Sequence, residues 1–553
     1  MVEQLWMRRA GVLLCVLVAG SGVCAESDAI RLNSLGFLPD APKRATVTSK
    51  GEAFSVRSAD DDAVVYSGTM VGPFRQQDVN QEVWVADFSA VKTPGRYIVE
   101  VAGVGRSIEF PVGPTVYDVA YYTAMRGFYL WRCGTGVEGV HDGQRYAHGA
   151  CHPEDGWQDH IEIADGRRDG TGGWHDAGDF GKYTVNAGVT VGVLFLAWEH
   201  FGERLKGRSL DVPETAAGWP DFLKELKWEM DWLLKMPYPD GSGRVSHKLT
   251  RHAFAGFIMP EEDKAKRYYT EWGSAATADF AAMAAMAARH FRPYDAAYAE
   301  TCLKAAQTSY AFLQAHPEDK RPDLTGFSTG GYRTTDPDDR LWAAAELWET
   351  TGDAAALSDF ETRAKAAGRL IEANWDWGNV GNLGMLTYLF STRQGRDPEL
   401  VERLGQSLIE TADALVAQAR ADVYGRPLGE RYYWGCNGTV ARQTVLLQAA
   451  NRLAPKAVYG DTALDAVGYL FGRNYYGRSY VTGLGHRPPM HPHDRRSGAD
   501  GIAAPWPGYL VGGGTRPTDW QDVQDSYRTN EIAINWQAAL VYALAGFVEG
   551  GGK

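Results

Sequence analysis

Residues 221–236 read DFLKELKWEMDWLLKM, and they set the period that most of the chain follows. The apolar positions recur three or four residues apart: Phe222, Leu223, Leu226, Met230, Leu233 and Leu234. This spacing places the apolar side chains on one face of a helix. Pro220 and Asp221 suit the start of that helix, and Pro237 suits its end. The stretch therefore predicts an amphipathic helix with one buried face.

The same period returns along the chain towards the C-terminus. Residues 277–291 are apolar almost all round, which predicts a buried helix, and further helices are predicted at 339–353, 462–474 and 535–547. We see no clear set of strands among them. Residues 115–550 are thus expected to form a helical domain of paired helices joined by long loops, with the functional site on those loops.

The N-terminal part has a different period. Residues 82–88, 95–101 and 107–112 are short runs rich in β-branched and aromatic residues, separated by turns such as Thr93-Pro94-Gly95. Short strands at this spacing indicate a small antiparallel β-sandwich, which we place at residues 28–113.

Residues 1–25 have the features of a signal peptide. Arg8 and Arg9 precede an apolar run from Gly11 to Val23, and Val23-Cys24-Ala25 offers small residues for cleavage. The run is short for a membrane span. We predict an exported protein, secreted or periplasmic, without a membrane anchor.

The composition of the 553 residues is that of a globular protein, with 44% hydrophobic and 23% charged residues. A net charge of −13 argues against a nucleic-acid partner. Aromatic residues make up 12%, a supply of flat faces that suits a carbohydrate-handling protein but also suits a large core. We expect a monomer.

Three segments carry candidate chemistry. Residues 172–183, GGWHDAGDFGKY, place Asp176 and Asp179 on a glycine-rich loop beside Trp174; a calcium loop or a helix cap is the alternative. Glu531 lies at the start of an apolar helix, where a carboxylate also favours the helix dipole. Residues 477–497 gather histidines and arginines in a Gly/Pro-rich loop suited to hydrogen bonding a polyhydroxylated ligand, or to solvent.

Together these segments resemble glycoside hydrolase family 9, which consists mostly of cellulases. Residues 172–188 are similar to its first catalytic segment, 479–495 to its histidine segment and 520–533 to its acid segment. Residues 30–47 resemble the start of the immunoglobulin-like module that precedes one branch of the family. The three catalytic segments occur in the family's order.

The resemblance implies an all-α barrel of six helix pairs, preceded by the immunoglobulin-like sandwich. It implies hydrolysis of β-1,4-glucan or cello-oligosaccharides with inversion at the anomeric carbon. By position, Asp179 is the general base, Glu531 the general acid, and Asp176 helps hold the water. The resemblance gives sugar-binding roles to His493 and Arg495 and an orienting role to Asp522. We also expect His247 to face the cleft and bind substrate, as we expect of Trp174 beside the aspartate loop.

The chain departs from the family pattern at two positions. Gln537 stands where the family commonly has Asn, and Asp494 replaces the second His of the histidine segment. These changes concern the preferred substrate more than the reaction.

A metal site is a further expectation. Cys133, Cys151, His152 and His175 would make a closed tetrahedral zinc set, and family members with the immunoglobulin-like module often carry structural zinc near this place. A Cys133–Cys151 disulfide or two buried thiols are the alternatives. Calcium is also common in the family; residues 239–243 and 336–340 offer oxygen ligands, but no site is assigned.

The leading prediction for the activity is an endo-acting β-1,4-glucanase. An exo-acting β-glycosidase, such as a β-glucosidase or glucosaminidase, would need a cleft blocked at one end. A catalytically inactive glycan-binding protein would need neither Asp179 nor Glu531.

Overall fold

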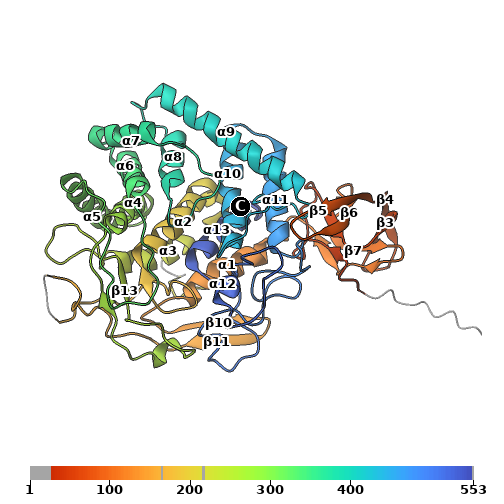
Figure 1. Ribbon diagram of the computed structural model, residues 1–553, viewed down its shortest axis with the longest axis horizontal. Helices are drawn as coiled ribbons and strands as arrows, with labels where there is room; N and C mark the ends of the chain where they lie inside the picture. Colours follow the sequence, from red (N-terminus) through yellow and green to blue (C-terminus); the bar gives the residue numbers. More distant parts are fainter. Residues whose placement is uncertain (1–25, 163–165, 215–217, 551–553) are drawn as a thin grey trace, which may run out of the picture.

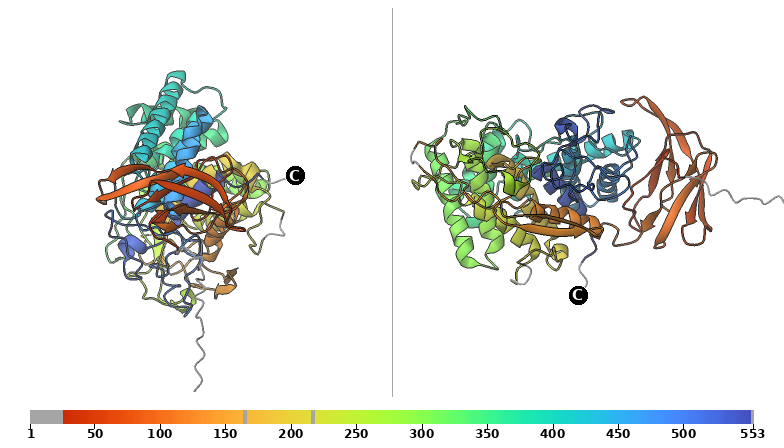
Figure 2. Two further views of the ribbon diagram at one scale, coloured as in Figure 1. Left: turned by 90° about the vertical axis from the view of Figure 1, so that its right-hand side faces the viewer. Right: turned by 90° about the horizontal axis from the view of Figure 1, so that it is seen from below.

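The computed structural model describes residues 26–162, 166–214 and 218–550, so the predicted signal peptide lies outside the described residues. Figure 1 shows a β-domain at one end of the molecule and a larger helical domain beside it. The right-hand view in Figure 2 also shows the β-domain at one end. No described helix has the length and apolar character that a membrane crossing requires.

The β-domain contains two sheets. The strand order of the first is β1-β2-β6-β5, and that of the second is β4-β3-β7-β8, with β9 paired to β7. All their pairings are antiparallel. The strands are β1 Ile30–Arg31, β2 Arg44–Val47, β3 Ala53–Ser58, β4 Val64–Thr69, β5 Val71–Gln76, β6 Gln81–Asp87, β7 Gly95–Val101, β8 Gly105–Arg106 and β9 Phe110–Val112.

A separate apolar core holds this β-domain together. The Phe37 ring lies edge-on to Phe88 and Phe110, each with a centroid distance of 5.4 Å. Polar contacts then join the β-domain to the helical domain. The Thr46 hydroxyl donates to the Val423 carbonyl at 2.7 Å, and Arg44 pairs with Asp465 at 3.2 Å. The β-domain is thus held against the helical domain by direct contacts.

The helical domain is built from an inner and an outer set of helices. The inner helices are α2 Thr184–Leu205, α4 Ser274–Phe291, α6 Pro337–Thr351, α8 Gly381–Phe390, α10 Cys436–Leu453 and α13 Ile534–Ala545. The outer helices are α1 Asp118–Leu130, α3 Asp221–Leu233, α5 Ala296–Ala315, α7 Ala354–Ala366, α9 Pro398–Ala421 and α11 Ala457–Leu470. In the part of the chain that the structure describes, the one-turn helices η2 Pro260–Glu262 and α12 Tyr527–Asn530 lie in loops.

Neighbouring inner helices pack in the order α8, α6, α4, α2, α13 and α10, while α9 contacts both α8 and α10. Each outer helix packs against an inner one, as α5 does on α4 and α11 on α10. This order explains why residues 277–291 are apolar all round: α4 touches α2, α3, α5 and α6. Residues 221–236 have a single apolar face because α3 lies on the outside.

The helical domain also contains strands that the sequence analysis missed. β10 Val137–His141 and β11 Gln144–His148 form a hairpin, and β12 Lys182–Tyr183, β13 Lys248–Thr250 and β14 Tyr268–Tyr269 form a small sheet. The hairpin turns through Asp142 and Gly143, both at positive φ, which is the Asp-Gly signature of a tight hairpin turn. The Asp142-Gly143 dipeptide was the feature of the sequence that could have predicted this hairpin.

Candidate active site

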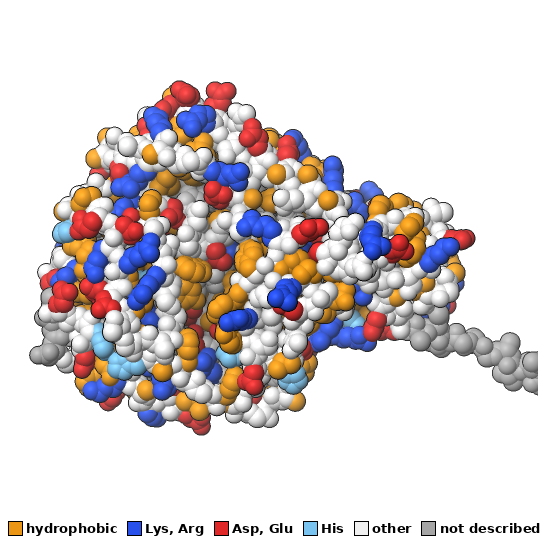
Figure 3. All heavy atoms as spheres, in the orientation of Figure 1, with side chains coloured by type: hydrophobic (Ala, Val, Ile, Leu, Met, Phe, Trp, Pro, Cys, Tyr) orange, Lys and Arg blue, Asp and Glu red, His pale blue; other side chains and the backbone are white. Residues whose placement is uncertain are grey.

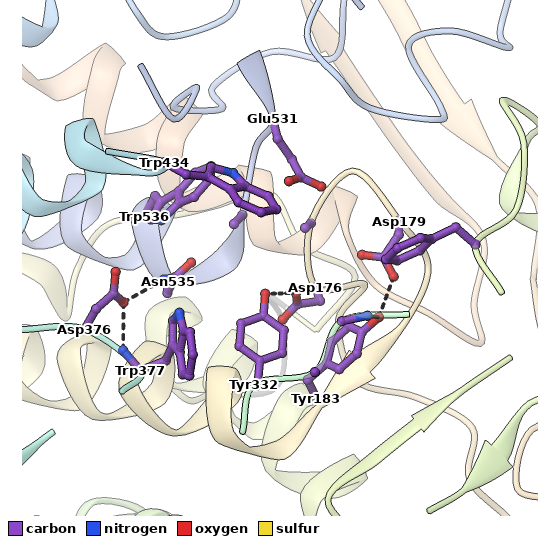
Figure 4. A pocket seen from close by; sticks show the side chains of 15 residues that line it. Asp176, Asp179, Tyr183, Tyr332, Asp376, Trp377, Trp434, Glu531, Asn535 and Trp536 are labelled. Atoms are coloured by element: carbon purple, nitrogen blue, oxygen red, sulfur yellow. Dashed lines mark hydrogen bonds between the residues drawn. The ribbon is translucent and has the colours of Figure 1, made fainter. Parts of the chain in front are cut away.

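A pocket of about 300 Å³ opens among the loops of the helical domain. Its lining residues lie almost entirely just before, or in the first turn of, α2, α6, α8, α10 and α13; Phe254 is the exception. Figure 4 shows Asp176, Asp179 and Glu531 on this pocket together with aromatic side chains. The face in view in Figure 3 is hollowed, and hydrophobic side chains gather in the hollow.

Backbone contacts bring the three motif segments together. Ala177 bridges to Ala533, and His493 bridges to Glu531. The Arg495 amide and guanidinium both donate to the Gly178 carbonyl, at 3.2 and 2.6 Å. Residues separated by more than three hundred positions in sequence therefore share one site.

Gly178 permits the closest of these approaches. An ideal Cβ at this position would lie 2.0 Å from the His493 carbonyl oxygen, where ordinary contact begins at 3.4 Å. A side chain of any size would push the aspartate loop away from the histidine segment. Glycine is needed here for close backbone approach, as its place in the motif suggests.

Asp176 and Asp179 occupy different environments in the pocket. Asp179 Oδ2 accepts hydrogen bonds from the Gly181 amide and the Tyr183 hydroxyl, both at 2.9 Å. No described residue donates to its other oxygen. Asp176 accepts from Asn186 and Tyr332, both at 2.7 Å. Burial and the charge of Asp179 raise the pKa of Asp176 to about 8, so Asp176 carries a proton at neutral pH.

Glu531 approaches the pocket from another side. Figure 4 shows its carboxyl group and that of Asp179 pointing towards each other across the pocket. No described residue donates a hydrogen bond to the Glu531 carboxyl. Burial and then the charge of Asp179 raise the pKa of Glu531 well above its usual range, although Arg495 acts in the opposite direction. This shift favours the protonated form of the Glu531 carboxyl.

His493 and Arg495 lie beside these carboxyl groups. His493 Nδ1 lies 2.7 Å from the Gln524 carbonyl, and the ring packs edge-on to Phe257 at 5.5 Å. The carbonyl fixes Nδ1 as the donor, which leaves Nε2 as an acceptor. Arg495 Nε donates to the Ala255 carbonyl at 2.8 Å. Arg495 therefore ties the 251–257 segment to the aspartate loop.

Asp522 lies outside the pocket lining and acts through its neighbours. Its carboxylate accepts from the amides of Met490 and His491 at 2.9–3.0 Å and from Arg478 at 2.9 Å. Burial alone would raise its pKa, but these hydrogen bonds lower it. Asp522 therefore anchors the loop that leads into His493.

The structure corrects two expectations about the cleft. Trp174 is buried, its indole N–H donates to Glu225 at 2.8 Å, and its ring packs on Phe128 at 4.6 Å, so it belongs to the core. His247 is also buried and bonds the Gly331 carbonyl at 2.7 Å from behind the pocket wall. Its pKa is lowered to about 4 by burial. Neither side chain lines the pocket.

Other aromatic residues supply the walls instead. The sequence analysis missed the residues that line the pocket beside the carboxyl groups: Tyr183, Phe254, Tyr332, Asp376, Trp377, Trp434, Asn535 and Trp536. Phe254 and Trp434 remain 46% and 50% exposed, as suits flat faces that receive a ligand. In the sequence these residues share one feature: most of them directly precede or begin an inner helix.

The two departures from the family pattern lie away from the pocket lining. Gln537 is buried, donates to the carbonyls of Ala124 and Gly508 at 2.7 Å, and accepts from the Leu510 amide. Asp494 is buried against Arg496 and Ser497. Both side chains brace the scaffold.

The four predicted metal ligands come together in one buried cluster. One ligand atom from each of Cys133, Cys151, His152 and His175 lies within 4.8 Å of the others. The two sulfurs are 3.9 Å apart, too far for a disulfide bond of about 2.05 Å, and both thiols are free. The disulfide alternative is therefore excluded in this structure.

The spacing of the donors fits a tetrahedral ion. Cys133 Sγ lies 3.6 Å from His152 Nδ1, and Cys151 Sγ lies 3.7 Å from His175 Nε2. A tetrahedral ion bonded at about 2.3 Å to sulfur and 2.0–2.1 Å to nitrogen would place a sulfur and a nitrogen about 3.5 Å apart and two sulfurs about 3.8 Å apart. Burial alone would raise the pKa of Cys133, but Cys151, Lys182 and Arg267 lower it well below 9.0, towards the thiolate that binds metal.

Opposed carboxyl groups in an aromatic-walled pocket, mounted on a helical scaffold, define the class of protein: an enzyme that hydrolyses glycosidic bonds.

Comparisons with known proteins agree with this class. The model of "Glycosyl hydrolase family 9" matches residues 117–544, and that of "Cellulase N-terminal ig-like domain" matches residues 25–106. The chain therefore belongs to glycosyl hydrolase family 9.

Individual relatives cover nearly the whole chain. Endoglucanase D of Acetivibrio thermocellus is 56% identical over 94% of this chain and 83% of its own length. A xyloglucan-specific endo-beta-1,4-glucanase of Bacteroides ovatus is 34% identical over 96% and 95%. A solved zinc-binding triple mutant of a family 9 endoglucanase is 33% identical, has a TM-score of 0.87, and covers 93% of this chain and 100% of its own.

Proposed function

We propose that the chain is an endo-acting β-1,4-glucanase that inverts the anomeric carbon. One observation carries the proposal: Asp179 and Glu531 face each other across a pocket whose walls are aromatic. Inversion requires an acid and a base on opposite faces of the sugar, with room for one water between the base and the ring. The endoglucanase relatives support the same substrate class.

The base in this mechanism is Asp179. Tyr183 and the Gly181 amide hold one of its oxygens, and the other is left to accept a proton from water. Asp176 holds the same water as a neutral acid, because burial and Asp179 raise its pKa to about 8. Two neighbouring carboxyl groups in different protonation states can thus divide orientation and proton abstraction between them.

The acid is Glu531, which protonates the departing glycosidic oxygen. Its raised pKa keeps the proton in place near neutral pH. His493 Nε2 and the free edge of the Arg495 guanidinium bind sugar hydroxyls beside the scissile bond. Asp522 acts indirectly, because it fixes the loop that leads into His493.

Endo action is favoured over exo action by what forms the pocket. No lining residue comes from the β-domain, so that domain does not close the pocket. A chain of glucose units can then cross the cleft and be cut internally. The aromatic walls offer stacking faces for successive sugars.

The Cys133, Cys151, His152 and His175 cluster is proposed to hold structural zinc. Two thiolates and two imidazoles close the coordination sphere, which leaves no position for a substrate. His175 directly precedes Asp176, so the ion would fix the base of the aspartate loop. Its role is therefore to hold the loop rather than to take part in the reaction.

The wider organisation is proposed as follows. The inner and outer helices form a barrel of six pairs over residues 115–550, and residues 28–113 form the immunoglobulin-like module. Residues 1–25 direct export to the periplasm or the exterior, and the mature protein is a monomer.

Two measurements test the proposal. The anomer first released from a soluble cello-oligosaccharide, followed by NMR before mutarotation, should be α; initial β-product would refute inversion. Asp179→Asn and Glu531→Gln should each lower turnover by roughly 10²–10⁴-fold, the usual share of general acid–base catalysis, with little change in binding. Single glucose units released from one chain end would instead favour an exo-acting enzyme.

A further inference from the structure

A second pair of metal-binding side chains lies at the surface, apart from the buried cluster. His160 and His252 are 92 positions apart in sequence, yet their Nε2 atoms lie 2.8 Å from each other. His252 is exposed and His160 is half-buried. No other described residue hydrogen-bonds to either Nε2 atom. The two imidazoles therefore hydrogen-bond to each other through their Nε2 atoms, at a position that water can reach.

The surrounding rings hold both imidazoles in place. Tyr268 stacks on His252 at 4.5 Å and packs edge-on to His160 at 5.1 Å. Phe327 packs on His160 at 4.8 Å and on His252 at 5.0 Å. Both imidazoles are clamped by the same two aromatic side chains, so little freedom of rotation would be lost when they bind a common ligand.

From this geometry we propose that His160 and His252 form a binding site for a divalent transition metal of the Ni²⁺ or Cu²⁺ type. Imidazole is a preferred ligand of these ions, which favour right angles between neighbouring ligands. Two nitrogens bonded at about 2.0–2.1 Å and at right angles lie about 2.9 Å apart. The 2.8 Å separation matches this arrangement and is shorter than a tetrahedral ion requires. Water completes the coordination sphere.

The site would join two loops at the rim of the active-site pocket. His160 lies three residues after Trp157, which forms a β-bridge with Tyr268. His252 lies two residues before Phe254, which lines the pocket. The His252 carbonyl also accepts from the Ser328 amide at 2.7 Å, next to the pocket wall at Gly330. A bound ion would therefore tie the outer loop to two segments that border the substrate.

The test is a calorimetric titration of the purified protein with Ni²⁺. The buried cluster of Cys133, Cys151, His152 and His175 keeps whatever metal it holds after purification. We expect one exchangeable Ni²⁺ per chain. His160→Ala and His252→Ala should each weaken this binding by at least about 10–100-fold, the loss that even an outer-shell change causes. His316→Ala is the matched control: His316 stacks on Phe312 and has no second histidine beside it, so its removal should leave binding unchanged.

Melting temperature gives a second readout. Ni²⁺ should raise it in the wild-type protein and in His316→Ala but not in the other two variants, because a ligand stabilises only the form that binds it. Melting without metal shows whether each variant is folded, and either single variant suffices for the test. Absence of binding in the wild-type protein, or an affinity equal to that of the wild-type protein in either pair variant, would overturn the proposal.

Discussion

Gly178→Ala tests how tightly the catalytic segments must approach one another. The added Cβ would lie 2.0 Å from the His493 carbonyl oxygen and 2.9 Å from its carbonyl carbon. Ordinary contact begins at 3.4 Å, so the two backbones must separate by about 1.4 Å. Both partners of this clash are backbone, and neither can rotate away.

The separation would act directly on the reaction geometry. The Gly178 carbonyl would lose its two hydrogen bonds from Arg495, and Asp179 would move relative to Glu531. A displacement of about 1 Å in a catalytic group can lower the rate by about 10²-fold. We expect a loss of at least that size in kcat/KM on a soluble β-1,4-glucan.

Gly331→Ala is the control, since Gly331 lines the same pocket but has nothing within 4 Å of an added Cβ. It should keep activity within a few-fold of wild type, and circular dichroism should show both variants folded. A Gly178→Ala enzyme with near wild-type kcat/KM would refute the claim that the contact between the loops sets the catalytic geometry.

Four further predictions concern the base, the acid, the metal cluster and a buried pair of aspartates. Tyr183→Phe removes one hydrogen bond to the base and should lower kcat about 10-fold or more with little change in KM, measured on cello-oligosaccharides; an unchanged kcat would exclude a positioning role. Because the pKa of Glu531 is raised, the alkaline limb of the kcat/KM profile should lie above the ordinary range of a glutamate, and a limb near pH 4.5 would contradict this assignment. Cys133→Ser should release about one zinc per chain, by elemental analysis, and lower the melting temperature; metal-free wild-type protein would argue against the site. Asp279 and Asp339 are buried and their pKa values are raised, so in the folded protein they keep protons that the unfolded chain releases above about pH 4. The free energy of unfolding should therefore fall as pH rises above about 4. Asp279→Asn should melt at a higher temperature than wild type at pH 8 but not at pH 4, and an equal difference at both pH values would contradict this account.

The regular elements were largely predictable from the sequence. Residues 221–236 and 277–291 gave helices α3 and α4, and residues 82–88 and 95–101 gave strands β6 and β7, because their apolar periods are unambiguous. The strand predicted at residues 107–112 was only partly confirmed, since strand β9 begins at Phe110. Period alone does not mark where a strand starts to pair.

The site was predictable in part. The motif segments meet as expected, and the four metal ligands form one cluster. Trp174 was misplaced because adjacency to a catalytic loop does not fix the direction of a side chain. Trp377, Trp434 and Trp536 were missed because one sequence gives no means of separating a tryptophan in a wall from one in the core.

The position of the pocket has an electrostatic consequence. The chain enters α2, α6, α8, α10 and α13 from the residues that line it, so the N-terminal ends of these helices are directed towards the same space. Each helix N-terminus carries roughly half a positive charge from its aligned peptide dipoles. None of these lining residues is a lysine or an arginine, yet the pocket collects four carboxyl groups, those of Asp176, Asp179, Asp376 and Glu531. The backbone itself thus supplies the positive potential in which a negatively charged base can persist beside a neutral acid.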